Sequence, residues 1–164
     1  MRIQTRNIPE AGLDVEFAIP HDVMAQSAAK EDHLKNLFPK DVDCHIHLEI
    51  TRKDVFVSGN ADTFIHPVCD RCLETFDQPF QVHLVMTCSP EPTPRQSGDS
   101  YQESEEGLTY YRNNEIDLSE IVREQILLDL PMGYLCHQDC LGLCPQCGNN
   151  LNAGEHTCTK RKAK

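Results

Sequence analysis

Cysteine spacing is the feature that most constrains the fold of this chain. The chain has nine cysteines, and most of them stand in groups with only one to three residues between metal-ligating side chains. An odd number of cysteines in such groups argues against a set of disulfides and favours metal binding. The groups are Cys69 and Cys72, Cys136 and Cys140, Cys144 and Cys147, and His156 and Cys158.

The expected compartment also favours a metal over disulfides. Residues 1–7 lack the apolar run of a secretory signal, and no stretch of the chain has the length and apolarity of a membrane span. We therefore expect a cytoplasmic protein without a membrane partner, in a compartment where thiols are kept reduced. A length of 164 residues suits a single domain over residues 1–164.

The segment Cys144-Pro145-Gln146-Cys147-Gly148 is the most specific signal in the sequence. Two intervening residues let both sulfurs reach one tetrahedral ion while the backbone turns between them. Gly148 can adopt the left-handed conformation that follows such a turn. Backbone N–H groups in the turn then point at the sulfurs and stabilise their negative charge. The segment therefore predicts a zinc site, with Zn–S distances of ~2.3 Å.

A structural zinc site needs four ligands, and the clustered residues can be divided in two ways. In the first division, one zinc is held by Cys69, Cys72, Cys136 and Cys140, and a second by Cys144, Cys147, His156 and Cys158. In the second division, one zinc is shared by Cys69, Cys72, Cys144 and Cys147. The first division uses every clustered cysteine, and we prefer it.

The cysteine pairs also admit other chemistries. A thiol redox enzyme would place Cys69 and Cys72 at a helix N-terminus in a βαβ unit, whereas their flanks alternate like antiparallel strands. A further alternative is an iron–sulfur cluster held by Cys136, Cys140, Cys144 and Cys147. The chain could also be a metal-dependent enzyme or a zinc-ribbon transcription-associated factor. The carboxylates between residues 99 and 120 are accompanied by no partner nucleophile and no glycine-rich phosphate loop, which favours a non-enzymatic protein with no small-molecule substrate.

Alternating apolar residues predict an α+β fold with an antiparallel sheet of about five strands. We expect strands over 13–19, 42–50, 55–64 and 80–88, a hairpin turn at 52–54 and a bulge or bend at Gly59-Asn60. Cys44 and Cys88 fall on inward faces, where a thiol packs as a small apolar group. Helices are predicted over 22–37 and from an Asp117 N-cap to Leu130, with Glu120 in a capping box. Residues 136–158 would form a zinc-ribbon-like C-terminal section.

Charge is distributed unevenly along the chain. The formal net charge of −11 disfavours naked nucleic acid as a partner of the whole surface and leaves room for a basic protein partner. Residues 89–109 combine prolines, glycines and acids, and predict a flexible acidic loop. Residues 159–164 form a basic tail, in which the candidate partner-binding residues are Lys160, Arg161, Lys162 and Lys164.

Three separate segments carry a resemblance to a known family. They are Cys69-Asp70-Arg71-Cys72-Leu73-Glu74, the helix that begins at Glu115-Ile116-Asp117-Leu118 and ends at Leu130-Pro131, and the segment 139–152 around Cys144-Pro145-Gln146-Cys147-Gly148. In this order, over about residues 40–158, the chain resembles the YceD family, whose members are called large ribosomal RNA subunit accumulation proteins.

The resemblance implies a cytoplasmic bacterial protein, with an organelle branch in plants, that supports accumulation of large-subunit ribosomal RNA. The implied partner is a large-subunit ribosomal protein or precursor large-subunit rRNA, and the acidic composition favours the protein. Family members carry the first Cys-x-x-Cys widely and some lack the second, which fits two separable sites. Where His156 stands, a cysteine is commoner in the family. We therefore expect a non-enzymatic factor with one or two Zn²⁺ per chain.

Overall fold

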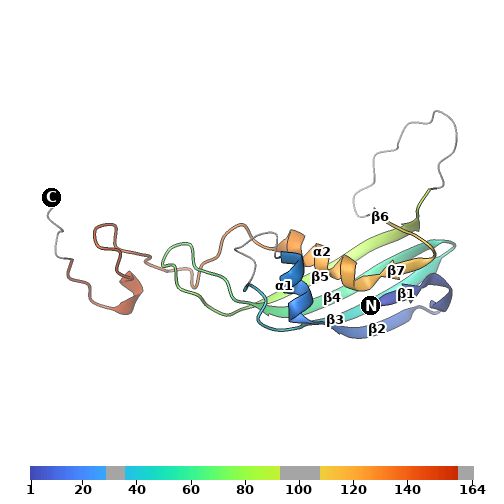
Figure 1. Ribbon diagram of the computed structural model, residues 1–164, viewed down its shortest axis with the longest axis horizontal. Coiled ribbons are helices and arrows are strands. Elements are labelled where there is room, and N and C mark those ends of the chain that lie inside the picture. Colours follow the sequence, from blue (N-terminus) through green and yellow to red (C-terminus); the bar gives the residue numbers. More distant parts are fainter. Residues whose placement is uncertain (29–35, 93–107, 159–164) are drawn as a thin grey trace, which may run out of the picture.

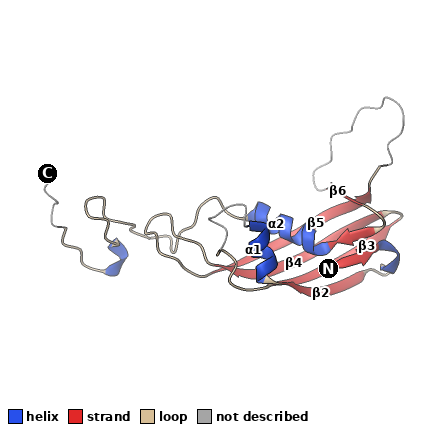
Figure 2. Ribbon diagram, viewed as in Figure 1, coloured by secondary structure: helices blue, strands red, loops and turns tan. Residues whose placement is uncertain are grey.

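The computed structural model describes residues 1–28, 36–92 and 108–158 (Figure 1). Most of the strands form one sheet, and both α-helices lie against one of its faces (Figures 1 and 2). The C-terminal section extends away from one end of the sheet together with residues 66–77. The molecule is therefore elongated, with a sheet at one end and a loop-rich section at the other.

The main sheet has five strands in the order β2 (Leu13–Ile19), β3 (Val42–Thr51), β4 (Asp54–Ile65), β5 (Gln78–Pro90) and β6 (Leu108–Tyr111). The first four pair antiparallel, as the alternating sequence predicts. The β6 strand pairs parallel to β5, so the expectation of a wholly antiparallel sheet is wrong at this edge. A parallel neighbour needs a long return connection, and the segment between Pro90 and Leu108 has the required length.

The β3–β4 hairpin has the predicted turn and lacks the predicted bulge. Thr51 pairs with Asp54 across a two-residue turn in which Arg52 has a φ of 61°. At Gly59 the pairing register continues without a skipped residue, so the expected bulge is wrong. A glycine is still required there, because its φ is 154° and a Cβ would collide with the backbone oxygen of His45.

The helices differ in how well the sequence predicts them. The α1 helix spans His21–Ala28, and residues 29–35, which the prediction included, lie outside the described residues. Residues 36–38 are not helical, so the predicted end at Leu37 is wrong; Leu37 and Phe38 are buried in the core instead. The α2 helix spans Leu118–Asp129, and its predicted N-cap Asp117 accepts a hydrogen bond from the Glu120 backbone N–H at 3.3 Å.

Short elements complete the fold. The strands β1 (Arg2–Gln4) and β7 (Glu115–Asp117) form a separate antiparallel pair that the sequence did not reveal. Two 3₁₀ turns, η1 (Thr5–Asn7) and η3 (Leu151–Ala153), lie at opposite ends of the chain. In the predicted acidic loop 89–109, β5 continues to Pro90 and β6 begins at Leu108, while residues 93–107 lie outside the described residues.

The hydrophobic core lies between the helices and the inner face of the sheet. It includes Leu48, Val57 and Leu84 from the strands and Val122 and Ile126 from α2. Cys44 and Cys88 are also buried there, at 1% and 0% exposure, as predicted. Burial raises the pKa of the Cys44 thiol to about 12 and that of Cys88 to about 11. Both thiols therefore stay protonated and act as packing groups.

The outer face of the sheet carries acidic side chains beside a few exposed apolar ones, Phe56, Phe64 and Val85. Strands β2 to β5 contain no Lys or Arg, whereas Asp14, Glu16 and Glu49 are exposed on this face. The His47 Nδ1 atom lies 2.6 Å from Asp14 Oδ1, and this hydrogen bond is the main cause of the raised pKa of His47. Neither α-helix that the structure describes is long and apolar enough to cross a lipid bilayer.

Candidate metal centres

Two distant segments form the loop-rich section, which we call the cysteine module (residues 66–77 and 131–158). The first segment connects β4 to β5 and contains Cys69 and Cys72. The second follows α2, where Pro131 ends the helical region. In Figure 1 these segments lie side by side and beyond the end of the sheet. The fold therefore brings an internal strand connection to the C-terminal cysteines.

The first centre consists of Cys69, Cys72, Cys136 and Cys140. Their four sulfurs lie within 4.8 Å of one another. The Cys69–Cys140 sulfur distance is 3.8 Å and the Cys72–Cys136 distance is 3.7 Å. Sulfurs at the corners of a tetrahedron around zinc are about 3.8 Å apart when each Zn–S bond is ~2.3 Å. The spacing therefore fits a four-thiolate zinc site, and it is too long for disulfide bonds.

Hydrogen bonds between the two segments also join the residues around the first centre. The Asp70 backbone N–H donates to the Tyr134 carbonyl at 2.9 Å, and the Tyr134 N–H donates to Asp70 Oδ2 at 2.8 Å. The Arg71 guanidinium donates to the Cys140 carbonyl at 3.1 Å. Both residues lie between the candidate ligands Cys69 and Cys72. The turn that supplies two sulfurs thus also docks the segment that supplies the other two.

The second centre consists of Cys144, Cys147, His156 and Cys158, whose ligand atoms also lie within 4.8 Å of one another. The Cys144–Cys158 sulfur distance is 3.7 Å, and His156 Nε2 lies 3.3 Å from the Cys147 sulfur. A tetrahedral site with three thiolates and one imidazole needs about 3.6 Å between sulfur and nitrogen. Cys144 is buried and its three partners are half-buried, so this centre is more open than the first.

The thiols of the first centre have opposed tendencies to ionise. Burial raises the pKa of Cys69, but backbone hydrogen bonds from Cys136, Cys72 and Arg71 outweigh burial and lower that pKa to about 6. Burial and the neighbouring sulfurs raise the pKa of Cys136 to about 12. One thiolate therefore forms readily, and further ionisation is opposed. A divalent cation would relieve this opposition, because it neutralises the charge that the thiolates share.

The second centre repeats this pattern. Backbone hydrogen bonds from Gln146 and Cys147 lower the pKa of Cys144 to about 6, as the turn between the two cysteines predicts. Burial, followed by contact with the Cys144 and Cys147 sulfurs, raises the pKa of Cys158 to about 11. The Gly148 N–H donates to the Cys144 carbonyl at 2.8 Å, and its φ is 77°. The turn therefore has the left-handed glycine that the sequence predicts.

The structure gathers the eight predicted ligands into the two groups of the first division. Cys69 and Cys72 lie with Cys136 and Cys140, and not with Cys144 and Cys147 as the shared site of the second division requires. The basic residues 160–164 lie outside the described residues. Sequence reasoning missed the docking roles of Asp70 and Arg71, because their partners are backbone groups more than sixty positions away.

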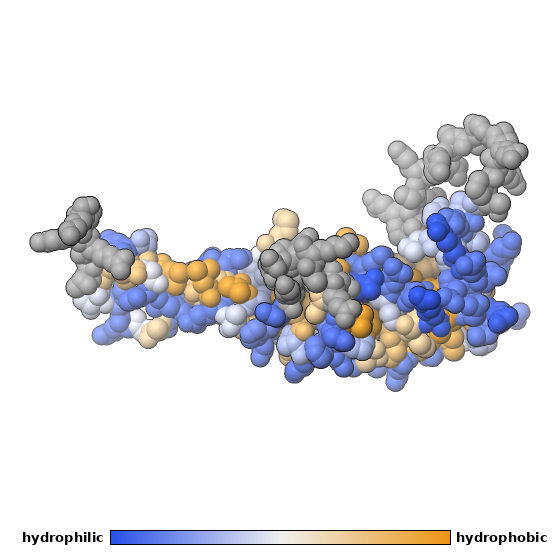
Figure 3. Space-filling model, in the orientation of Figure 1, coloured by the Kyte–Doolittle hydropathy of each residue, from blue (hydrophilic) through white to orange (hydrophobic). Residues whose placement is uncertain are grey.

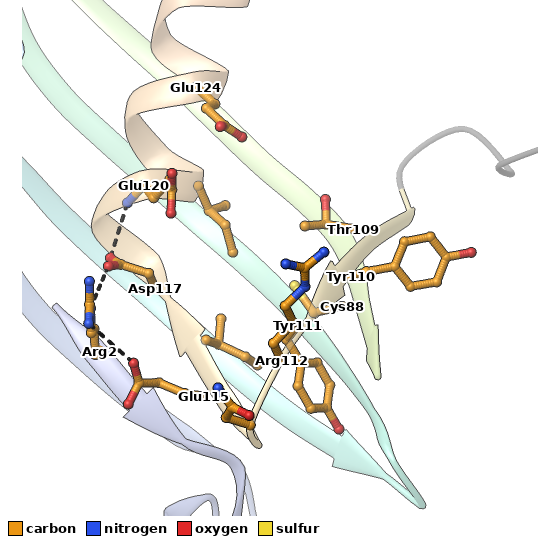
Figure 4. Close-up of a pocket in the computed structure, with 13 residues that line it drawn as sticks. Arg2, Cys88, Thr109, Tyr110, Tyr111, Arg112, Glu115, Asp117, Glu120 and Glu124 are labelled. Carbon is orange, nitrogen blue, oxygen red and sulfur yellow. Dashed lines mark hydrogen bonds and ion pairs between the residues drawn. The ribbon is translucent and has the colours of Figure 1, made fainter. Parts of the chain in front are cut away.

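A cavity of about 460 Å³ lies at the other end of the molecule, between β6, β7 and α2 (Figure 4). Its carboxylates include Glu115 and Asp117, which flank Arg2 in Figure 4. The Arg2 guanidinium lies 2.9 Å from Asp117 and 3.5 Å from Glu115. These ion pairs join β1 to β7 and to the start of α2. Glu115 and Asp117 are therefore engaged in structural ion pairs, and the cavity is not our candidate site.

Comparison with known proteins agrees with the cysteine pattern. The family model described as large ribosomal RNA subunit accumulation protein YceD matches residues 57–164. The chain belongs to the YceD family. The match contains both candidate metal centres and the α2 helix, which lies in the sequence between Cys72 and Cys136 of the first centre. The resemblance of the three sequence segments to YceD proteins is thereby confirmed.

Curated relatives of the chain include bacterial and plant proteins. An uncharacterized protein of Mycobacterium tuberculosis is 30% identical over 108 residues, covering 65% of this chain and 50% of the relative. A Mycobacterium leprae protein is 24% identical over 110 residues, covering 67% and 49%. A large ribosomal RNA subunit accumulation protein YCED homolog 1, chloroplastic, from Zea mays is 38% identical over 53 residues, covering 32% and 18%. The chain spans about half the length of the mycobacterial relatives. No solved structure matches the chain.

Proposed function

We propose that this chain is a non-enzymatic zinc-binding factor that supports accumulation of large-subunit rRNA and assembly of the large ribosomal subunit. Membership of the YceD family carries the proposal, since the matching range includes every residue of the two candidate centres. The family is named for accumulation of an RNA and not for a reaction. The mycobacterial relatives favour a bacterial protein, and a ribosomal role favours a cytoplasmic location.

The ligand sets favour a structural role for zinc. Each candidate centre supplies four protein ligands, whereas a catalytic zinc keeps one position open for water or substrate. Sulfur-rich tetrahedral sets suit zinc or an iron–sulfur cluster and not the oxygen-preferring magnesium or calcium ions. Zinc bound at the first centre would join residues 66–77 to residues 131–158 in a zinc-ribbon-like section. A colourless purified protein would separate zinc from iron–sulfur.

The acidic sheet face favours a basic ribosomal protein as the direct partner. The outer face of β2 to β5 offers carboxylates such as Asp14, Glu16 and Glu49 without any Lys or Arg in those strands. Complementary charge speeds encounter with a basic partner and repels the phosphate backbone of RNA. Precursor rRNA remains a partner for the basic residues 160–164, whose charges suit phosphate contacts.

One observation favours a thiol redox enzyme as a second candidate. The Cys69 thiol has a pKa of about 6, in the range of reactive cysteines. However, Cys69 is 0% exposed and contacts the Cys140 sulfur, so a substrate disulfide could not reach it without opening the module. Titration of the native protein with a thiol reagent separates the candidates. A structural centre leaves these sulfurs unreactive until zinc is removed.

The proposed function is tested in a strain from which the gene has been deleted. We expect a lower ratio of large-subunit to small-subunit rRNA, restored by the wild-type chain and by Cys88→Ser but not by Cys72→Ser. Cys88 is a matched control because its buried thiol lies outside both centres. An affinity-tagged chain should also retain a large-subunit ribosomal protein at moderate salt. An unchanged rRNA ratio, or recovery of non-ribosomal partners alone, would contradict the proposal.

A further inference from the structure

The two centres share one small hairpin. Residues 140–144 run antiparallel to residues 149–152: Leu143 bridges to Asn150, the Cys144 N–H donates to the Asn149 carbonyl at 2.8 Å, and the Leu151 N–H donates to the Gly142 carbonyl at 2.8 Å. Cys140, at one end of this hairpin, is a candidate ligand of the first centre. Cys144 and Cys147, at its turn, are candidate ligands of the second.

Asn152 is the side chain that fixes the hairpin to the first centre. Its Oδ1 accepts a hydrogen bond from the Leu141 N–H at 2.8 Å. Its Nδ2 donates to Asn150 Oδ1 at 2.8 Å and to the Cys140 sulfur at 3.3 Å. A backbone N–H can only donate, so the orientation of the Asn152 amide is determined by its partners. Both amide hydrogens and the oxygen are therefore in use.

We propose that the two metal centres load cooperatively, and that Asn152 is the positioning residue that couples them by holding the hairpin of the second centre against the Cys140 sulfur of the first. The inference rests on the zinc centres of the proposed function. Metal at the second centre orders the turn at Cys144 and Cys147, and with it the strand that carries Asn152. The ordered amide then stabilises negative charge on Cys140.

The physical basis is shared ordering. Whichever centre binds metal first also orders the hairpin, so the second metal ion meets a segment that is already in place. Linkage requires the coupling to be reciprocal, with each metal strengthening the other by the same factor. Couplings of this kind are typically between about fivefold and 150-fold in affinity, and we expect about tenfold here.

The experiment is a titration of the metal-free full chain with Co²⁺, whose spectra distinguish the four-thiolate set from the set with one imidazole. The double variant Cys144→Ser/Cys147→Ser removes two ligands of the second centre. We expect the first centre of this variant to bind Co²⁺ about tenfold more weakly than in the wild type. Affinity unchanged within about twofold would overturn the inference.

A second variant leaves all eight ligands in place. Asn152→Asp keeps the oxygen that accepts from Leu141, but it puts a carboxylate oxygen where the amide donates to the Cys140 sulfur. We expect weaker Co²⁺ binding at the first centre, and a sulfur-to-cobalt charge-transfer band at lower energy because the thiolate loses a donor. Asn149→Asp is the matched control. It adds the same charge at an exposed position of the same hairpin.

The possible failures are distinguishable. If Asn152→Asp and Asn149→Asp have the same affinity and the same charge-transfer energy, Asn152 does not couple the centres and the inference is wrong. If both centres bind Co²⁺ with independent affinities, the coupling fails while the zinc centres of the proposed function stand. If the wild-type chain binds no Co²⁺ at all, the inference and the zinc part of the proposed function fail together.

Discussion

The sheet end and the cysteine module are stabilised in different ways. The sheet has a continuous core in which residues such as Leu48, Leu84 and Ile126 are at most 1% exposed. The buried cluster of the module is made of Cys69, Cys72 and Cys140, with Phe76 and Cys136 packed against it. Figure 3 shows the same contrast in shape, with a thick body at the sheet and a thin extension at the module.

This difference in core composition indicates which interaction stabilises each region. Burial of apolar side chains contributes about 1.5–3 kcal/mol for each large residue, so the sheet can fold on its own core. The module has few such residues, and Leu73 and Leu141 within it are 63% and 67% exposed. Structural zinc contributes roughly 10–16 kcal/mol per site at pH 7, which exceeds what the small cysteine cluster can supply. The module should therefore be metal-dependent and the sheet metal-independent.

Removal of zinc should give the largest effect. A strong chelator is expected to abolish amide protection over residues 66–77 and 131–158, because the sulfurs then repel one another when they ionise. The strands β2 to β5 should keep their protection, since their core lies outside both centres. Hydrogen exchange read by mass spectrometry measures both regions in one sample. Equal loss of protection in the sheet, or unchanged protection in the module, would contradict the claim that only the module depends on metal.

Truncation of a side chain in the sheet core should destabilise the sheet and leave the zinc content of the module unchanged. Leu48→Ala is expected to lower the free energy of unfolding by about 2–5 kcal/mol, because Leu48 is 0% exposed. The exposed Leu141→Ala serves as the control and should change it by less than about 0.5 kcal/mol. Denaturant unfolding followed by circular dichroism gives these values, and zinc content should be unchanged in both variants. Loss of zinc from Leu48→Ala would show that the two regions fold as one unit.

The Asp117 N-cap should make a smaller contribution to the free energy of unfolding of the sheet end. Asp117→Ala is expected to lower the free energy of unfolding by about 0.5–2 kcal/mol, since it removes the N-cap of α2 and one of the two carboxylate partners of Arg2. Burial raises the pKa of Asp117, but bonds from Arg2 and the Glu120 N–H outweigh it and lower the pKa. The contribution is therefore present above the ordinary carboxylate pKa of about 3.9 and is lost as pH falls through the lowered value.

Unfolding measured across pH tests the sign of this effect. The stability difference between wild type and Asp117→Ala should be constant at neutral pH and should shrink in acid. A difference that grows as the pH falls would contradict the assignment of the lowered pKa to the Arg2 and helix contacts.

The smallest expected effect is in the docking of the module. Arg71→Ala removes the guanidinium that donates to the Cys140 carbonyl, and its exposure limits the loss to about 1 kcal/mol, or about fivefold in zinc affinity at the first centre. The control is Arg112→Ala, which removes an exposed ion pair with Glu91 far from the module. Competition with a zinc indicator dye measures both affinities. Equal affinities in the two variants would mean that Arg71 does not help to dock the module.

Much of the sheet could be predicted because apolar residues recur at every second position of its four long strands, although Phe56, Phe64 and Val85 are apolar at exposed positions. The parallel β6 strand could not be predicted, since it has only four residues and its pairing with β5 follows a long connection. The β1 and β7 strands have three residues each, too few for periodicity to show. Leu37 was predicted to end a helix, but it is buried in the core together with Phe38, and this burial overrides local propensity.

The candidate centres were predictable to the level of residue type and of the cysteine pairs along the chain. Cys-x-x-Cys spacing identifies the pairs, yet it cannot say which pair meets which, because that depends on how α2 directs the chain back to residues 66–77. The role of Asn152 was not predicted. The only signal in the sequence is the Asn150-Leu151-Asn152 pattern after Gly148, which is typical of side chains that bond the local backbone. Zinc ligation itself remains a prediction.

Zinc stoichiometry in matched variants tests the central claim most directly. Native mass spectrometry of the wild-type chain should find two zinc ions, and Cys72→Ser and Cys147→Ser should each retain one. Cys88→Ser should retain both, since its thiol belongs to the sheet core. A single zinc in the wild type that is lost from both ligand variants would indicate one shared site. That result would contradict two separate centres in a metal-dependent module.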